Sequence, residues 1–245
     1  MNQDKALRRN SVYYFILFFL LALWAFWPGY YGRLSERLPG YIHLHGSTMT
    51  LWCLALIGQA LLIRLKKNKV HKRIGQLSYF LVLMIMISGF HAAHQTLKGV
   101  PAMARSGTYY ATIALMFNSL IIFLVLYGLA IYHRKNVKLH ARYMVSTIFP
   151  IITPLTDRLV YNHAPGLLAY VPTMEGRPIV WYVGFLLADL ALISLIIMDW
   201  SRLKRIKAFP IVLGLVTLYH LSVLWFHNFG CWRSIGDWIM ALPLS

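Results

Sequence analysis

The sequence predicts an all-α integral membrane bundle of seven transmembrane helices. The 245 residues are 59% hydrophobic and only 13% charged, and the mean hydropathy is +0.59. A soluble domain of this size needs more charge on its water-facing surface. Apolar runs of about 20 residues, the length that crosses a hydrocarbon core, follow one another along the chain. These observations indicate a polytopic membrane protein.

The apolar runs occupy residues 12–30, 42–63, 74–95, 108–132, 143–162, 179–198 and 209–228. The stretches between them are too short for a separate soluble domain, so residues 1–245 are expected to form a single transmembrane domain. The first run is too long for a removable signal peptide and is interpreted as a permanent anchor. The last segment, from residue 230 to 245, is expected to lie along the outer membrane interface rather than to cross it.

Basic residues indicate the orientation of the chain. Most of the 24 lysines and arginines lie before the first run and in the second, fourth and sixth connections. The positive-inside rule then places the N-terminus in the cytoplasm and the C-terminus outside, in a bacterial inner membrane. These clusters are short and flank apolar runs, so the predicted partner of the positive charge is anionic lipid, and nucleic acid is not expected to bind.

Six of the ten histidines fall at the predicted outer ends of the runs: His43, His45, His91, His94, His163 and His227. His91 and His94 share a helix face, whereas His43 and His45 point in nearly opposite directions, which favours the deeper His45. Neutral imidazole binds zinc, copper, iron and haem. We therefore expect a haem or transition-metal site at His45, His91 and His94, with His163 and His227 as further metal ligands. Histidines solvated by lipid headgroups are the alternative.

Two short patterns carry a resemblance to known proteins. The segment His43-Leu44-His45-Gly46, followed by the loop His71-Lys72-Arg73, resembles uncharacterised bacterial multi-span membrane proteins. The same His-x-Arg loop before a span is more remotely similar to the four-span assembly factors of cytochrome c oxidase. These resemblances imply a role near respiratory metal or haem chemistry, with a respiratory or other membrane redox protein as partner.

A second set of polar residues lies within the runs, where ionisable groups are costly and face the protein interior or water. The set comprises Asn118, Asp157, Arg158, Asp189 and His220. Asp189, His220 and Asn118 have similar predicted depths, so Asp189 is expected to orient or charge His220. Interhelical hydrogen bonds that only hold the spans together are the alternative. Pro150 and Pro154 predict a kink in the fifth helix.

The functional interpretations remain open at this point. The first is a metal- or haem-binding protein with a redox or respiratory-assembly role. The second is a transporter or small-molecule-binding protein that uses the Asp189 and His220 pair. The third is a metal-dependent membrane hydrolase, which the absence of His-Glu-x-x-His and Cys-x-x-Cys patterns disfavours. The sequence does not decide whether the protein is an enzyme.

Overall fold

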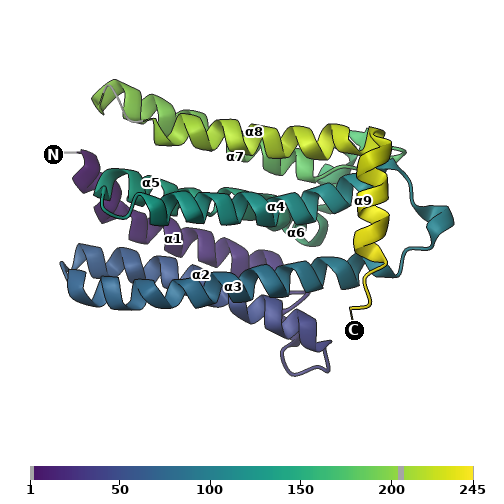
Figure 1. Ribbon diagram of the computed structural model, residues 1–245, viewed down its shortest axis with the longest axis horizontal. Coiled ribbons are helices and arrows are strands. Elements are labelled where there is room, and N and C mark those ends of the chain that lie inside the picture. The colour runs from purple at the N-terminus through teal and green to yellow at the C-terminus, as the bar shows by residue number, and fades with distance from the viewer. Residues whose placement is uncertain (1–2, 204–206, 245) are drawn as a thin grey trace. The chain divides into compact units, whose positions relative to one another are not determined.

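The computed structural model describes residues 3–203 and 207–244. The described chain is almost entirely helical (Figure 1), which confirms the all-α class. The α-helices are α1 (Gln3–Phe26), α2 (Gly40–Arg64), α3 (Asn68–Lys98), α4 (Gly107–Tyr132), α5 (Val137–Ser146), α6 (Phe149–His163), α7 (Trp181–Leu203), α8 (Ala208–Trp225) and α9 (Gly230–Met240). Short elements connect them: η1 (Tyr31–Arg33), η2 (Ala102–Ala104), η3 (Pro165–Tyr170), η4 (Phe226–Asn228), and strands β1 (Thr173–Met174) and β2 (Arg177–Pro178).

Five helices in the described chain have the length and hydropathy of membrane spans. They are Gly40–Arg64, Asn68–Lys98, Gly107–Tyr132, Trp181–Ser201 and Ala208–Asn228. They correspond to the second, third, fourth, sixth and seventh predicted runs. The apolar part of the first helix is shorter, Asn10–Phe26. The protein therefore has the helices of a membrane protein, and five of the expected spans are present as single long helices.

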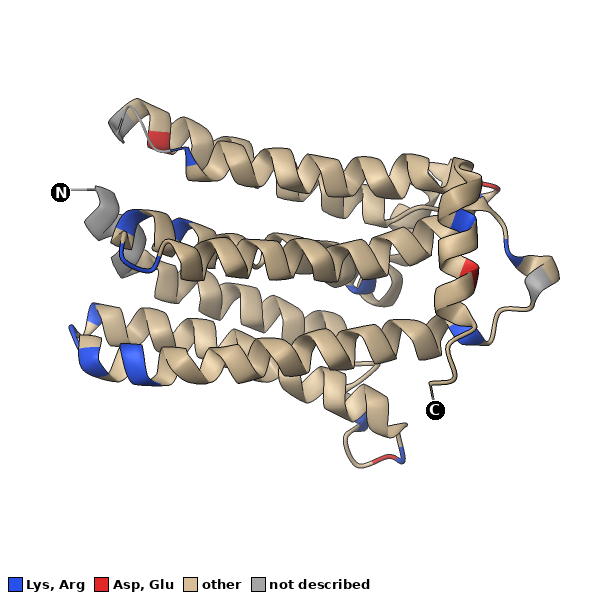
Figure 2. Ribbon diagram, in the orientation of Figure 1, with Lys and Arg blue, Asp and Glu red and all other residues tan. Residues whose placement is uncertain are grey.

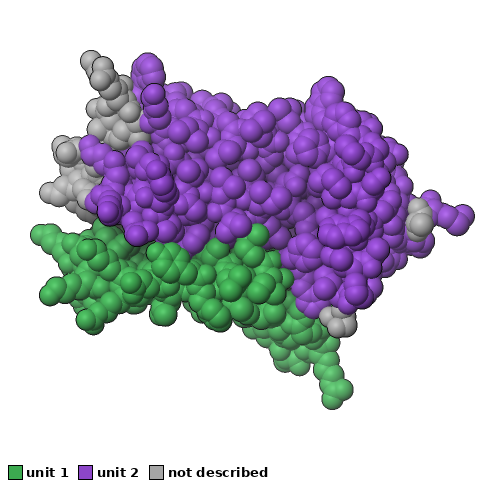
Figure 3. Space-filling view, in the orientation of Figure 1, with its two compact units in different colours: residues 1–89 green, residues 90–245 purple. Residues whose placement is uncertain are grey.

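The chain divides into two compact units, residues 1–89 and residues 90–245 (Figure 3). In the first unit, α1 packs against α2. The Tyr31 hydroxyl lies 2.8 Å from the Thr50 hydroxyl, and a Cβ atom at Gly46 would overlap the ring of Tyr30. A glycine at this position therefore allows the chain after α1 to lie against the start of α2.

In the second unit, α4 packs against α5 and α8, and α7 packs against α6 and α8. A buried cluster built from these helices includes Leu126, Phe149, Leu192, Phe209 and Val216. At Gly184 of α7, a Cβ atom would lie only 2.8 Å from the Cα of Thr153 in α6. The absence of a side chain at Gly184 thus lets the backbones of α6 and α7 approach closely.

The fifth predicted run is interrupted. One kinked helix was expected over residues 143–162, but the structure has α5 and α6, separated at Thr147 and Ile148. Proline has no N–H, so Pro150 leaves the Ser146 carbonyl without its helical donor. The backbone tightens here: the amides of Thr147 and Ile148 donate to carbonyls three residues earlier, at 3.3 and 3.4 Å. The irregularity predicted for the fifth run is therefore present, but the single kinked helix predicted over residues 143–162 is wrong, because the structure has two helices, α5 and α6.

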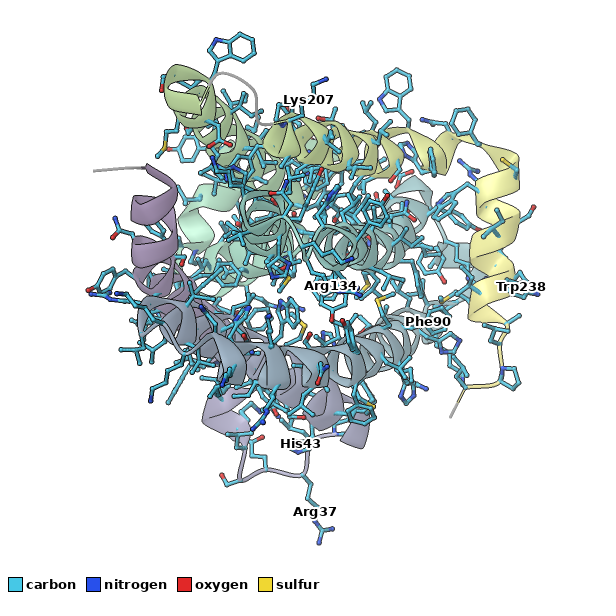
Figure 4. All side chains as sticks on the ribbon, turned by 60° about the vertical axis from the view of Figure 1, so that its left-hand side comes forward. Arg37, His43, Phe90, Arg134, Lys207 and Trp238 are labelled. Atoms are coloured by element: carbon cyan, nitrogen blue, oxygen red, sulfur yellow. The ribbon has the colours of Figure 1, made fainter. Side chains whose placement is uncertain are left out.

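Helix α9 crosses the ends of the other helices of the second unit instead of running parallel to them (Figure 1). Its Trp238 is 66% exposed and points away from the helix bundle (Figure 4). An amphipathic helix that carries an exposed tryptophan suits a membrane interface, where the indole ring is favoured. This arrangement fits the orientation expected for the last segment.

Lysine and arginine gather at particular helix ends (Figure 2). In the first unit they lie at the turn between α2 and α3, and in the second unit at the turn between α4 and α5. The long central portions of these helices carry almost no charge. The distribution within each unit is the one that a helix flanked by headgroup regions requires.

Candidate functional site

The Asp189 and His220 side chains meet in the second unit. His220 Nδ1 lies 3.3 Å from Asp189 Oδ2, so two ionisable groups near the middle of α7 and α8 are in contact. The His220 ring stacks on Phe185, with ring centroids 3.9 Å apart and an interplanar angle of 20°. The Phe185 ring therefore fixes the plane of the imidazole, and Nδ1 of His220 faces the Asp189 carboxylate.

The two partners differ in exposure. The His220 side chain is only 7% exposed, whereas the Asp189 side chain is 31% exposed. Asp189 Oδ1 is buried and has no hydrogen-bond partner among the described residues. An unsatisfied acceptor of this kind is costly in an apolar environment, and such groups in native structures are often functional. Asp189 is thus the less satisfied member of the pair.

Asn118 bonds Ser222 of α8 and not the Asp189 and His220 pair. Its amide donates to the Ser222 hydroxyl at 2.8 Å, and Ser222 donates to the Tyr219 carbonyl at 2.7 Å. Tyr219 in turn donates to the Leu115 carbonyl at 3.2 Å. These contacts join α4 to α8 on a face different from that of His220, because residues two apart point in nearly opposite directions. The three-residue cluster expected from the sequence is therefore reduced to two residues.

Asp157 and Arg158, just past the middle of α6, form a looser ion pair with a separation of 3.6 Å. Their side chains are 28% and 53% exposed. Adjacent residues in a helix do not face each other, and a partly exposed pair contributes little energy. These two side chains therefore form a partly exposed polar patch on α6 and not an organised site.

The outer histidines have different surroundings. His45, in the first unit, has Nδ1 3.4 Å from the Ser88 hydroxyl. His91 Nε2 lies 3.2 Å from the amide nitrogen of Gln95. His94 is completely buried, and neither ring nitrogen has a hydrogen-bond partner among the described residues. His163 ends α6 and is half-buried.

His227 lies in η4 beside the start of α4. A Cβ atom at Gly107 would lie 3.1 Å from His227 Cδ2 and 3.0 Å from Glu175 Oε1, so Gly107 is enclosed between the two side chains. Within the described chain, no three His, Cys, Asp or Glu side chains come together in an arrangement that could hold a metal ion. The expected five-histidine set is thus distributed over several separate environments.

Glu175 caps α4, a role that sequence reasoning missed. It lies in the turn between β1 and β2, where Glu175 and Gly176 both have positive φ values, 51° and 75°. Its carboxylate accepts hydrogen bonds from the Gly107 and Thr108 amides, both at 2.9 Å, and from the Thr108 hydroxyl at 2.6 Å. These donors, with the Ser106 hydroxyl, lower the pKa of Glu175 to about 2. A carboxylate at a helix N-terminus also stabilises the helix dipole.

A buried ion pair between α5 and α7 was also missed. Arg142 donates to Asp199 from Nε at 2.6 Å and from Nη2 at 2.8 Å, and the side chains are 2% and 11% exposed. The sequence grouped Arg142 with the basic loop residues, so its burial corrects that assignment. The available signal was Asn136, whose side chain caps a helix that begins at Val137 and so places Arg142 within a helix, directly before the apolar run.

We next compared the chain with known proteins. No family model, curated protein or solved structure matches it.

Proposed function

We propose that this chain is an integral membrane transporter or small-molecule-binding protein in which Asp189 and His220 bind a proton or a cationic solute. The observation that carries this proposal is the 3.3 Å contact between His220 Nδ1 and Asp189 Oδ2 on two helices of membrane-spanning length. Ionisable residues inside spans usually mark ion pathways and proton relays. The proposed topology has seven crossings of a bacterial inner membrane, with the N-terminus cytoplasmic and α5 and α6 together forming the fifth.

The pair suits proton exchange because its members offer different protonation chemistry. Asp189 has one oxygen in contact with the imidazole and one without a partner. A proton on the carboxylate and a proton on the ring are then alternative states of the same contact. Solute binding that favours one of these states would couple to proton uptake or release.

Proton flux in reconstituted vesicles tests the proposal. Vesicles that hold a pH-sensitive dye receive a potassium diffusion potential, and the wild-type protein should acidify or alkalise them faster than empty vesicles. Asp189→Asn and His220→Gln should reduce the rate to that of empty vesicles. Ser194→Ala is the matched control, because the exposed Ser194 on the same helix donates only to Leu190 of its own helix, at 2.8 Å. Flux in Asp189→Asn equal to that in wild type would refute the proposal.

A second candidate function, metal or haem binding with a redox or respiratory-assembly role, is favoured by one observation. His94 is fully buried, and its ring nitrogens have no partner that meets hydrogen-bond geometry among the described residues, although the Met240 and Leu242 backbones lie near enough to interact with the ring. A buried imidazole held by at most weak backbone contacts can serve as a ligand. The chain's other outer histidines, His45, His91, His163 and His227, would be the remaining ligands, and a membrane redox protein the partner.

An absorption spectrum and metal analysis on one purified sample test this second candidate. His94→Gln should lower haem or metal content, while His43→Gln should leave it unchanged, since His43 lies at the start of α2, in edge-on contact with Tyr30. Wild-type protein that contains neither metal nor haem would eliminate this candidate without affecting the first.

A further inference from the structure

A shallow, open apolar groove lies on the surface of α8 where it borders α7. It has a volume of about 670 Å³, and its lining includes Ile196 of α7 together with Pro210, Leu213, Gly214, Thr217 and Leu218 of α8. Thr217 is the one polar side chain of the lining. A groove with this lining suits a hydrocarbon chain, because it offers apolar contact and almost no hydrogen-bonding group.

Gly214 creates much of this space. A Cβ atom built at Gly214 meets nothing within 4 Å, so the hollow lies directly over the helix backbone. The neighbours on α8 are leucines and a threonine, and their side chains form the walls. Because the position is open, a larger side chain there fills the groove without displacing protein atoms.

The helical register connects the groove with the Asp189 and His220 pair. Ile196 follows Asp189 by seven residues on α7, so the two lie on the same face. Thr217 precedes His220 by three residues on α8, and Thr217 is exposed where His220 is buried. A rise of about 1.5 Å per residue puts Thr217 only about 4.5 Å from His220 along the helix axis. Neither Asp189 nor His220 lines the groove, but its end on α8 lies within one helical turn of His220, and Ile196 lies about two turns from Asp189 on α7.

The Asp189 carboxylate is only partly enclosed by protein. Its side chain is 31% exposed and its Oδ2 contacts the imidazole of His220, whereas Oδ1 is buried and has no partner among the described residues. A carboxylate at this depth is stabilised strongly by a positive group beside it, because little water is present to screen the interaction. The complementary ligand therefore has a cationic head and an apolar chain.

We infer that the α7–α8 groove binds a cationic amphiphile from the bilayer, with a protonated amine at Asp189 and an alkyl chain along Gly214. This inference rests on the proposed function, because it names the substrate class of the Asp189 and His220 pair. Access is lateral: the alkyl chain stays in hydrocarbon while the amine leaves the headgroup region. Binding then requires no aqueous passage through the helices.

Photolabelling of the full-length protein in phosphatidylcholine nanodiscs tests the inference. The probe is a dodecylamine with a diazirine on its alkyl chain, and the comparison probe is the dodecanol with the same diazirine. After irradiation, mass spectrometry locates the label. The amine should label peptides of α7 and α8 saturably and about ten-fold more strongly than the alcohol. This ratio corresponds to the weakest coupling energies measured for close charge pairs at interfaces.

Three variants make the result specific. Asp189→Asn keeps the side-chain shape and removes the charge, so amine labelling should fall about ten-fold, to the level of the alcohol. Gly214→Leu fills the groove and should abolish labelling of α8. Gly128→Leu is the matched control, because a Cβ atom there also meets nothing within 4 Å but the residue lies on α4, outside the groove lining. It should label as wild type.

The outcomes separate the two proposals. Equal labelling by amine and alcohol, or unchanged labelling in Asp189→Asn, overturns the cationic ligand and shows only a site for acyl chains. Labelling that persists in Gly214→Leu overturns the groove as its location. In either case a loss of proton flux in Asp189→Asn would leave the proposed function standing. Unchanged flux and unchanged labelling in Asp189→Asn would remove both.

Discussion

The buried ion pair of Arg142 and Asp199 is expected to dominate the stability of the part of the second unit where α5 packs near the C-terminal end of α7. Asp199→Asn removes the negative charge while leaving a side chain of the same shape. The Arg142 guanidinium, only 2% exposed, would then lose two charge-assisted hydrogen bonds of 2.6 and 2.8 Å. The guanidinium would keep contacts that include the Lys138 carbonyl at 3.1 Å and the face of the Phe209 ring at 5.9 Å, and the neutral asparagine oxygen could accept at most one of the two lost hydrogen bonds.

The expected cost follows from the energy of such bonds. Each hydrogen bond to a charged group contributes about 1.5–3 kcal/mol, and breaking a buried ion pair by removing one partner costs about 3–5 kcal/mol. The free energy of unfolding of Asp199→Asn should therefore fall by about 3–5 kcal/mol. Replacing both partners, as Arg142→Met with Asp199→Leu, removes the buried charges together and should cost much less than either single change.

Equilibrium unfolding in mixed micelles, followed by circular dichroism, measures these differences. The control cycle uses Arg33→Gln and Glu36→Gln, whose side chains also lie 2.7 Å apart but are 47% and 51% exposed. That exposed pair should show a coupling of about 0–1 kcal/mol. If the buried cycle shows a coupling as small as the exposed one, the argument from desolvation is wrong.

Three further predictions concern other contacts. Glu175→Gln should loosen the start of α4, which would appear as faster hydrogen exchange at Gly107 and Thr108. Because the pKa of the Glu175 carboxyl is lowered from 4.5 to about 2, the protection in the wild-type protein should be present above about pH 4.5 and be lost as the pH falls through about 2. The variant should lack this protection at every pH. Gly184→Ala should lower the free energy of unfolding by about 1–3 kcal/mol, because its Cβ would lie 2.8 Å from the Thr153 backbone, whereas Gly128→Ala, which meets nothing, should not. The exposed Cys231 should react with a membrane-impermeant maleimide added outside intact cells, while the buried Cys53 stays unmodified; labelling of Cys231 only in inverted vesicles would reverse the proposed orientation.

Much of the fold follows from composition and run length. Long apolar runs between basic turns are enough to predict α2, α3, α4, α7 and α8, because the hydrocarbon core sets the length of a spanning helix. The interruption of the fifth run was less predictable. Pro150 and Pro154 signal lost hydrogen bonds, but they do not by themselves specify that the helix breaks at Thr147 and Ile148, where the amides donate to carbonyls three residues earlier.

The site residues show the same division. Asp189 and His220 stand alone in apolar runs at matching depths, so their contact follows from the alternating direction of two consecutive helices. Arg142 and Asp199 gave no comparable signal, because each lies among charged neighbours near a helix end. Whether Arg142 belongs to a loop or to a buried helix face depends on where α5 begins, and that is set by the Asn136 side chain, which accepts from two amides at 3.2 Å.

Helix α7 thus carries two aspartates with opposite expected roles. Asp199 has both oxygens bound to Arg142 and is 11% exposed, so its charge is compensated and its removal should change stability. Asp189 has one oxygen without a partner among the described residues and is 31% exposed, so under the proposed function it is the carboxylate that binds a proton or a cation. Since a satisfied carboxylate has little to gain from a ligand, the substitution of Asp by Asn should lower stability at position 199 and reduce activity without loss of folding at position 189.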